Sequence, residues 1–321
     1  MTRARYPAAA MTLTVVGSIA FDAVETPYGR RDRLLGGSAV HFSLASSFLA
    51  ETRVVGPVGD DFGEEEYGVL HDRGVNTEDI EHVPGGTTFF WEGRYERDPA
   101  VRHTVRTDLN VFEHFAPKLS PASRAADTLF LANIQPDLQR EVREQCADAR
   151  FVAMDTMNYW IERTRPALMR TIAGVDCVIL NDEELKQLLD EPNLVRAARE
   201  LLTMGPRVVV AKQGEYGSAM YTADGIFSLP AYPTADVVDP TGAGDTFAGG
   251  FMGYVAAHSG EELTDELLRR AMAYGTAMAS FNVEAFGSER MQDLTGDEVS
   301  ARVAELQRVT RFDAAPVPMR A

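Results

Sequence analysis

The chain reads Asp239-Pro240-Thr241-Gly242-Ala243-Gly244-Asp245-Thr246-Phe247-Ala248-Gly249-Gly250-Phe251 across residues 239–251. The four residues before this stretch, 235–238, are strand-like and end in two valines. From Gly244 onward, large apolar side chains recur at i, i+4, i+7 and i+8, at Phe247, Phe251, Tyr254 and Val255, which is a helical spacing. The segment is therefore predicted to be a strand, a glycine turn and a helix.

The glycine turn is suited to binding an anion. Gly242, Ala243 and Gly244 leave backbone N–H groups bare at the start of a helix, where the helix dipole is positive. Such a site would hold a phosphate group or a developing oxyanion. Asp245 lies at its edge, where its carboxylate would repel a bound phosphate unless it takes a proton from an attacking hydroxyl. The alternative is a purely structural turn in which Asp245 only starts the helix.

Two other phosphate-binding motifs do not fit the chain. A dinucleotide fold needs Gly-x-Gly-x-x-Gly after the first strand, whereas these glycines lie at 242, 244, 249 and 250, near the C-terminal end. A P-loop needs Gly-Lys-Ser or Gly-Lys-Thr, and neither follows any glycine turn. A dinucleotide-dependent oxidoreductase is therefore disfavoured, and the phosphate site is not a P-loop.

The composition of the chain limits the kinds of molecule that it is expected to bind. The 321 residues include 31 Lys+Arg and 48 Asp+Glu, a formal net charge of −17, which repels nucleic acid and anionic membranes. With 45% apolar and 25% charged residues, the chain is typical of a soluble globular protein. Its length suggests one large domain, or a large domain with a smaller companion. A small-molecule substrate is expected, with no nucleic acid or membrane partner.

The cysteines and the start of the chain bear on localisation. Cys146 and Cys177 form no Cys-x-x-Cys pair, and no His cluster has metal-ligand spacing, so a reducing, cytoplasmic compartment is expected. Residues 1–21 superficially resemble a secretory signal, but residues 13–18 are better interpreted as a buried first strand. Met11 is then an alternative start of translation. No apolar run reaches the length needed to span a bilayer.

Strand-like and helical segments alternate along most of the chain, which predicts an α/β fold with a mostly parallel sheet. The predicted strands are Thr12–Gly17, Thr52–Val58, Thr128–Ala132, Phe151–Asp155, Cys177–Asn181, Val208–Lys212 and Ser218–Thr222. The predicted helices are Ala39–Leu49, Glu183–Leu189, Leu194–Met204 and Leu263–Phe281.

A β-hairpin interrupts this pattern. Residues 87–96 and 103–112 alternate strictly and are joined by Arg97-Asp98-Pro99-Ala100. On the first strand, one face carries Phe89, Trp91 and Tyr95 and the other carries Phe90, Glu92 and Arg94. An isolated hairpin is marginal in water, so this one should cover another part of the chain or pair with a second chain.

These motifs together resemble the PfkB, or ribokinase-like, family of carbohydrate and nucleoside kinases. The stretch at 239–251 resembles the C-terminal signature of that family. The other matching stretches are Gly17-Ser18-Ile19-Ala20-Phe21-Asp22, Gly36-Gly37-Ser38-Ala39, Val58-Gly59-Asp60-Asp61-Phe62-Gly63, Asn181-Asp182-Glu183-Glu184 and Lys212-Gln213-Gly214-Glu215-Tyr216-Gly217. They occur in the family's order and cover residues from about 12 to about 310.

The resemblance implies a three-layer α/β/α fold with a mostly parallel central sheet and a small β lid. The main domain would comprise residues 12–22, 38–84 and 113–310, and the lid would comprise 23–37 and 85–112. Residues 1–11 and 311–321 would be flexible tails. The hairpin would belong to the lid, which excludes water during transfer, and its face with Phe89, Trp91 and Tyr95 would pair two subunits in a homodimer.

The resemblance also implies an ATP-dependent phosphotransferase with an alcohol group as acceptor. Asp245 would be the general base, and Gly242, Ala243 and Gly244 would form the anion hole. Asn181 and Glu184 would hold Mg²⁺ through water. The nucleotide side would comprise Lys212, Gly214, Gly217 and Thr241. A monovalent cation such as K⁺ would lie among Asp239, Thr241, Asn282, Ala285 and Gly287.

The acceptor would be a small sugar or polyol. Asp22, Gly36, Gly37 and His41 would bind its hydroxyls, with Phe90, Glu92 and Arg94 facing it from the lid. Ribokinase has Lys and Asn where this chain has Ser38 and His41, so ribose itself is in doubt. A nucleoside kinase of the same fold is the alternative, stacking a base on Phe90 or Trp91. A non-catalytic sugar-binding or regulatory protein fits less well, because Asp245, the glycines and Glu184 are all present.

Overall fold

The computed structural model describes residues 12–312. The proposed start at Met11 and the predicted tails at 1–11 and 311–321 lie outside this range, apart from residues 311 and 312, which follow the last helix in irregular structure. Within the described range, none of the helices is both long and apolar enough to cross a lipid bilayer.

A nine-stranded sheet forms the centre of the molecule, in the order β13-β12-β11-β10-β9-β8-β1-β4-β5. Every pair from β5 to β11 is parallel, and β12 and β13 extend the sheet antiparallel. The strands are β1 (Thr12–Val16), β4 (Glu51–Val58), β5 (Asn76–His82), β8 (Thr128–Leu131), β9 (Phe151–Met154), β10 (Cys177–Asn181), β11 (Val208–Lys212), β12 (Ser218–Tyr221) and β13 (Ile226–Leu229). The seven predicted strands are confirmed to within one residue at each end.

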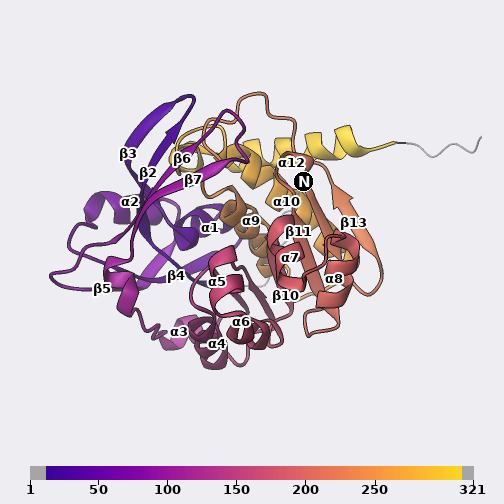
Figure 1. The fold of residues 1–321 in the computed structure, drawn as a ribbon, viewed down its shortest axis with the longest axis horizontal. Coiled ribbons are helices and arrows are strands. Elements are labelled where there is room, and N and C mark those ends of the chain that lie inside the picture. The colour runs from indigo at the N-terminus through magenta and orange to yellow at the C-terminus, as the bar shows by residue number, and fades with distance from the viewer. Residues whose placement is uncertain (1–11, 313–321) are drawn as a thin grey trace, which may run out of the picture.

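Helices cover both faces of this sheet, as Figure 1 shows with α10 and α12 along one side and α4 and α6 along the other. Successive strand residues alternate between two apolar cores: Leu13 and Val15 belong to one, and Val16 belongs to the other. The helices are α1 (Ser38–Ser46), α2 (Glu64–Asp72), α3 (Pro121–Arg124), α4 (Pro136–Gln145), α5 (Asn158–Arg163), α6 (Arg165–Ile172), α7 (Asp182–Leu189), α8 (Leu194–Leu202), α9 (Ala243–Ala257), α10 (Asp265–Asn282), α11 (Glu289–Asp293) and α12 (Gly296–Thr310). The three-layer α/β/α architecture is confirmed.

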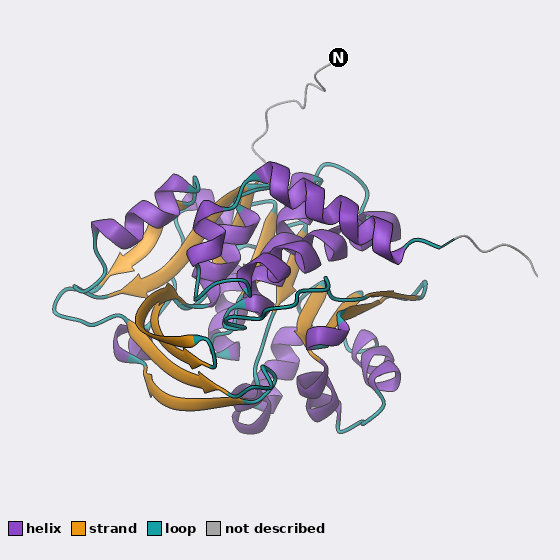
Figure 2. Cartoon of the chain, turned by 90° about the horizontal axis from the view of Figure 1, so that it is seen from above, coloured by secondary structure: helices purple, strands orange, loops and turns teal. Residues whose placement is uncertain are grey.

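A second sheet of four strands has the order β3-β2-β6-β7 and curls together at one side of the larger sheet (Figure 2). Its strands are β2 (Ala20–Thr26), β3 (Gly29–Gly36), β6 (Phe89–Tyr95) and β7 (Arg102–Asp108). We call this sheet the lid sheet. β6 and β7 form the predicted hairpin, and β2 pairs parallel with β6.

Two sequence-based expectations about strands were wrong. The second hairpin strand was expected to reach residue 112, but it ends at Asp108, because Asn110 has a left-handed φ of 50° and donates its amide to Thr88 O at 2.8 Å. A 3-10 turn over Asn110–His114 follows. The strand expected at 235–238 is a loop whose Val238 N–H donates to Val283 O, outside either sheet.

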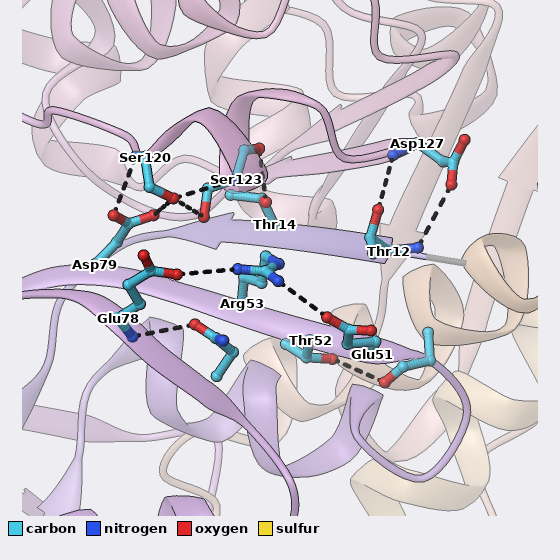
Figure 3. Close-up of polar contacts among 12 residues, drawn as sticks. Thr12, Thr14, Glu51, Thr52, Arg53, Glu78, Asp79, Ser120, Ser123 and Asp127 are labelled. Atoms are coloured by element: carbon cyan, nitrogen blue, oxygen red, sulfur yellow. Dashed lines mark hydrogen bonds and ion pairs between the residues drawn. The ribbon is translucent and has the colours of Figure 1, made fainter. Parts of the chain in front are cut away.

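Polar contacts fix the amino-terminal edge of the large sheet (Figure 3). The buried Thr14 hydroxyl on β1 donates to Ser123 O in α3 at 2.9 Å. Ser120 donates through its N–H and hydroxyl to Asp79 on β5 at 3.0 and 2.9 Å. These contacts tie the outer strands to the centre of the sheet. Ligands of open parallel sheets bind at the opposite, carboxyl edge, which is where the candidate site lies.

Candidate active site

The predicted glycine turn is the N-terminus of α9. Gly242 is its N-cap, with a left-handed φ of 73°. A Cβ at this position would lie 2.4 Å from the His41 ring, so both backbone conformation and space require glycine. Ala243 N–H donates to Pro240 O at 3.2 Å, whereas the N–H groups of Gly242 and Gly244 have no acceptor within residues 12–312. Two of the three expected anion-hole donors are therefore available.

A buried polar network holds this turn in place. Asp239 accepts hydrogen bonds from Thr241 N–H at 2.9 Å and Gly287 N–H at 2.8 Å, and Asn282 donates its amide to Thr241 O at 2.7 Å. Four of the five residues expected around a monovalent cation are thus joined directly. Because both Asp239 oxygens and the Thr241 carbonyl already accept hydrogen bonds, a cation here would depend on further backbone carbonyls, such as that of Ala285.

His41 lies beneath the turn. It is 1% exposed, its Nδ1 is 3.3 Å from Asn282 Oδ1, and its Nε2 has no partner in the described part of the chain. Burial lowers the pKa of His41 to about 4, so the ring is neutral near pH 7. The ring supports Gly242 directly, and the expected hydroxyl contact stays a prediction.

Three carboxylates, those of Asp155, Glu184 and Asp245, lie with Lys212 next to the start of α9. Lys212 Nζ, at the end of β11, is 3.2 Å from Asp155 Oδ2, at the end of β9. A Cβ on Gly244 would lie 2.9 Å from the same Nζ, so this amine points at the turn. Burial, then the charge of Asp155, raises the pKa of Asp245 to about 7. Burial alone would lower the pKa of Lys212, but the surrounding carboxylates outweigh it and raise that pKa.

Asp155 is a site residue that sequence reasoning missed. It was assigned only as a strand end, although a polar residue directly after a buried parallel strand is a signal for the ligand edge of a sheet. The buried Gln139 amide fixes it from α4 by donating to Asp155 O at 2.9 Å, Ala132 O at 2.9 Å and Leu131 O at 3.2 Å. Burial raises the pKa of Asp155, with Lys212 opposing the shift.

Asn181 and Glu184 form a capping box at the start of α7. Asn181 Oδ1 accepts from Glu184 N–H at 2.7 Å, and Glu184 Oε2 accepts from Asn181 N–H at 2.9 Å. Glu184 Oε1 makes no hydrogen bond to any residue between 12 and 312. Burial, then the nearby Asp155, raises the pKa of Glu184 to about 7. A buried carboxylate with one free oxygen fits a hard cation held largely through water.

The described residues hold no cluster of three or more His, Cys, Asp or Glu side chains arranged around a single metal position. Mg²⁺ at this edge would therefore take most of its ligands from water and substrate phosphates, which is the usual arrangement for this ion.

The acceptor-side residues meet at β2 and the start of α1. The Asp22 carboxylate lies against Gly36, where a Cβ would be 2.0 Å from Oδ2. Burial, then the charge of Asp239, raises the pKa of Asp22 to about 7, while the Gly37 N–H opposes the shift. The charge of Asp245 adds to the rise.

The lid sheet contacts the glycine turn through the face of β6 that carries Trp91 and Tyr95. Tyr95 Oη is 3.1 Å from Thr241 Oγ1, and Trp91 packs with Tyr95 and Phe286. Phe90, Glu92 and Arg94 lie on the other face of β6 from Tyr95, and their contact with a substrate stays a prediction. These three side chains lie on the outer face, where Glu92 pairs with Arg30 at 3.0 Å and Arg106 covers Phe90.

The same packing bears on the expected dimer contact, which stays a prediction. Tyr95 is buried within its own chain, Trp91 is partly buried beside it, and Phe89 packs against Phe112 at a ring distance of 5.7 Å. Much of this aromatic face therefore packs inside one subunit, and part of Trp91 stays accessible.

Gly214 and Gly217, which are predicted to bind the nucleotide, differ in the space around them. Gly217 has φ +94°, and a Cβ would meet Leu229 O at 2.1 Å, so the turn itself requires glycine. Gly214 has φ +55° and open space around it. The predicted nucleotide contacts of Gly214, Gly217 and Lys212 remain predictions.

The raised carboxyl pKa values make stability depend on pH. Asp22, Glu184 and Asp245 have folded-state pKa values of about 7, above their unfolded values, so the folded state binds more protons. Their stabilising effect is complete below the unfolded pKa values and is lost as pH rises through about 7. From pH 8 to 6.5 we expect the free energy of unfolding to rise by roughly 1 kcal/mol per group. As pH falls through 6.5, the ordinary pKa of histidine, protonation of His41 in the unfolded state opposes the gain.

Urea unfolding of the ligand-free protein at both pH values measures this effect. Asp245→Asn should reduce the difference, and a protein less stable at pH 6.5 than at pH 8 would contradict the raised pKa values of these carboxyls.

Several known proteins are similar to this chain in sequence or in fold. The family model for pfkB family carbohydrate kinases matches residues 12–293. The chain is 28% identical over 269 residues to the cytidine kinase of Thermococcus kodakarensis, covering 81% of this chain and 95% of that protein. It is 29% identical to the ATP-dependent ribose-1-phosphate kinase of Halopiger xanaduensis, covering 87% and 88% respectively. The nucleoside kinase structure from Methanocaldococcus jannaschii has the same fold, with a TM-score of 0.75, 21% identity and coverage of 92% and 98%.

Proposed function

The chain belongs to the pfkB family of carbohydrate kinases, and from this premise we propose that it transfers the terminal phosphoryl group of ATP to a hydroxyl of a small sugar or polyol. As a member of this family it is a phosphotransferase that acts on a hydroxyl group. The observation that carries the proposal is the position of Asp245, a half-buried carboxylate with a raised pKa in the first turn of α9, beside two backbone N–H groups that have no acceptor among residues 12–312.

In this proposal, acceptor and phosphoryl group meet at the start of α9. Asp22 and the backbone at Gly36 and Gly37 orient the acceptor hydroxyls. Asp245 takes the hydroxyl proton as the oxygen attacks phosphorus. The N–H groups of Gly242 and Gly244 hold the phosphoryl oxygens in an environment from which the lid excludes water.

The nucleotide side is assigned to Lys212, Gly214, Gly217 and Thr241. Asn181 and Glu184 would hold Mg²⁺ through water, and that ion would supply charge neutralisation for the phosphates. Asp239, Thr241, Asn282, Ala285 and Gly287 would surround K⁺. A cytoplasmic location is part of the proposal. A homodimer would pair through the exposed edge of β7, where Val105 is 60% exposed, rather than through the aromatic face.

A nucleoside is the second candidate acceptor, and one observation favours it. The Trp91 indole lies across Gly93 in its own strand, since a Cβ on Gly93 would be 2.0 Å from the ring. This leaves a flat aromatic surface on the lid face that covers Asp22 and Thr241, suited to stacking a base. The cytidine kinase and nucleoside kinases among its relatives agree with this alternative.

The test is ADP formation from ATP across a panel of sugars, sugar phosphates, polyols and nucleosides, with Mg²⁺ and K⁺ present. A sugar or polyol that is turned over supports the first proposal, and turnover of nucleosides alone supports the second. ATP binding without turnover of any acceptor would instead favour a sugar-binding or regulatory protein.

Asp22→Ala should separate acceptor binding from nucleotide binding. Removing the carboxylate deletes up to two hydrogen bonds to acceptor hydroxyls, so we expect the acceptor KM to rise about 10- to 100-fold. The KM for ATP should change less than about threefold, since Asp22 lies on the opposite side of the transferred group. Steady-state kinetics with each substrate varied in turn measures both, and equal losses for the two substrates would overturn the assignment.

A further inference from the structure

Arg102 is the first residue of β7 and lies directly opposite Tyr95 in the β6–β7 ladder. Side chains of directly paired residues point to the same face of a sheet. Tyr95 contacts Thr241 in the anion-hole turn, so Arg102 is on the lid face that covers the site. Its guanidinium carbon lies 5.9 Å from the centre of the Trp91 ring, on that same face.

The position of Arg102 is set by a short, ordered turn. Glu96 N–H donates to Val101 O at 3.1 Å, and Val101 N–H donates to Asp98 O at 3.0 Å. These hydrogen bonds close the turn next to Arg102. Arg102 therefore belongs to an ordered hairpin.

The site beneath Arg102 has an excess of negative charge. It contains Asp155, Glu184 and Asp245, and its lysine, Lys212, is already paired with Asp155 at 3.2 Å. A nucleoside triphosphate would add several more negative charges. Arg102 itself makes no ion pair within 4.0 Å to any carboxylate of the described chain, and its charge lowers the pKa values of both Asp245 and Glu184. The exposed Arg102 side chain thus has no carboxylate partner among the described residues, and the strand register and the Trp91 contact place it on the face of the lid sheet that meets Thr241.

We propose that Arg102 is a further catalytic residue, a lid-borne cation that contacts the oxygens of the phosphoryl group during its transfer. In that step the acceptor oxygen forms a bond to the γ-phosphorus and gives its proton to Asp245. The bond from that phosphorus to the bridging oxygen breaks, and ADP leaves with the electron pair. The guanidinium stabilises charge on the equatorial oxygens.

This role links acceptor binding to catalysis. Asp22 pairs with Trp91 across β2 and β6, so the sheet that carries Arg102 also forms one wall of the acceptor site. Closure of the lid sheet over an acceptor brings the cation over the phosphoryl group in the same movement, which assembles the full site only when the acceptor is present.

The inference rests on the proposed kinase function, and its test has two independent readouts. Arg102→Met should lower kcat about 10²- to 10³-fold with the acceptor KM changed less than threefold, and Arg102→Lys should recover part of the loss. Arg106→Met is the matched control, because Arg106 is on the same strand but on the outer face, over Phe90 and paired with Asp108. It should behave as the unaltered protein.

The second readout needs no turnover. Calorimetry with ADP and Mg²⁺, with and without aluminium fluoride as a mimic of the transferred group, should show tighter binding with fluoride in the unaltered protein and in Arg106→Met. Arg102→Met should bind ADP normally but lose most of the gain from fluoride. If Arg102→Met keeps that gain, the proposal is overturned whatever the acceptor is. If the gain is lost while no acceptor on the panel is turned over, the contact between Arg102 and the phosphoryl mimic is supported and the proposed acceptor class fails separately.

Discussion

Asp245→Asn is expected to lower kcat by about 10²- to 10⁴-fold while leaving the KM for ATP nearly unchanged. The amide is almost the same size as the carboxylate, so α9 and its free N–H groups should stay in place, but Asn accepts no proton from the acceptor hydroxyl. The remaining rate would come from positioning of the two substrates and stabilisation by the anion hole. The measurement is steady-state ADP formation with the best acceptor from the panel.

The same variant has a second expected consequence. Burial and Asp155 hold the pKa of Asp245 well above its usual range, which means that its charge opposes folding near neutral pH. Removing the charge should raise the melting temperature of the ligand-free protein by about 2 °C or more at pH 8. A variant that retains more than about a tenth of the turnover would overturn the general-base assignment. A lower melting temperature would instead show that Asp245 stabilises the helix start.

The strands of the large sheet were predictable because buried parallel strands are continuous apolar runs. Val208–Lys212 illustrates this, with four buried residues and a polar end. The edge strand β5 was missed because it has no such apolar run. β5, which reads Asn-Thr-Glu-Asp-Ile-Glu-His, is only partly buried and shows no apolar alternation. Its place in the sheet comes from pairing with β4, which local sequence does not encode.

Site residues that lie close together within one sequence motif were predictable. The turn at 239–245 and the capping box at Asn181 and Glu184 each depend on residues a few positions apart. Asp155 was missed because its meeting with Lys212 requires the strand order β9-β10-β11. Arg102 was missed because its face depends on a register shift in the β6–β7 ladder between Glu92 and Gly93.

The lid sheet shows what the alternation of side chains along a strand can and cannot predict. Period two correctly separated Trp91 and Tyr95 from Phe90 and Glu92, but it does not say which face meets the site. Only the contact between Tyr95 and Thr241, which joins residues far apart in the sequence, identifies the face of β6 that lies against the glycine turn.

Gly242→Ala is the second substitution with a large expected effect, since it disturbs the anion hole itself. The Cβ would lie 2.4 Å from the His41 ring, and φ is +73°. The ring is buried and hydrogen-bonded to Asn282, so it has little room to move. We expect turnover to fall at least 10²-fold, because the Gly242 and Gly244 donors shift away from the phosphoryl oxygens. Left-handed strain alone should cost about 1–2 kcal/mol of stability.

Gly244→Ala, two residues along the same turn, provides the matched control. Its Cβ would meet only the end of the flexible Lys212 side chain, at 2.9 Å, and φ at this position is not positive. This variant should melt within about 2 °C of the unaltered protein, since alanine suits the first turn of a helix better than glycine. Thermal unfolding and steady-state kinetics of the two variants, measured side by side, distinguish the causes. If Gly242→Ala is as stable and active as Gly244→Ala, then the His41-supported turn is not the phosphoryl-binding element. If only Gly242→Ala fails, the left-handed glycine above His41 is what holds the donors in position.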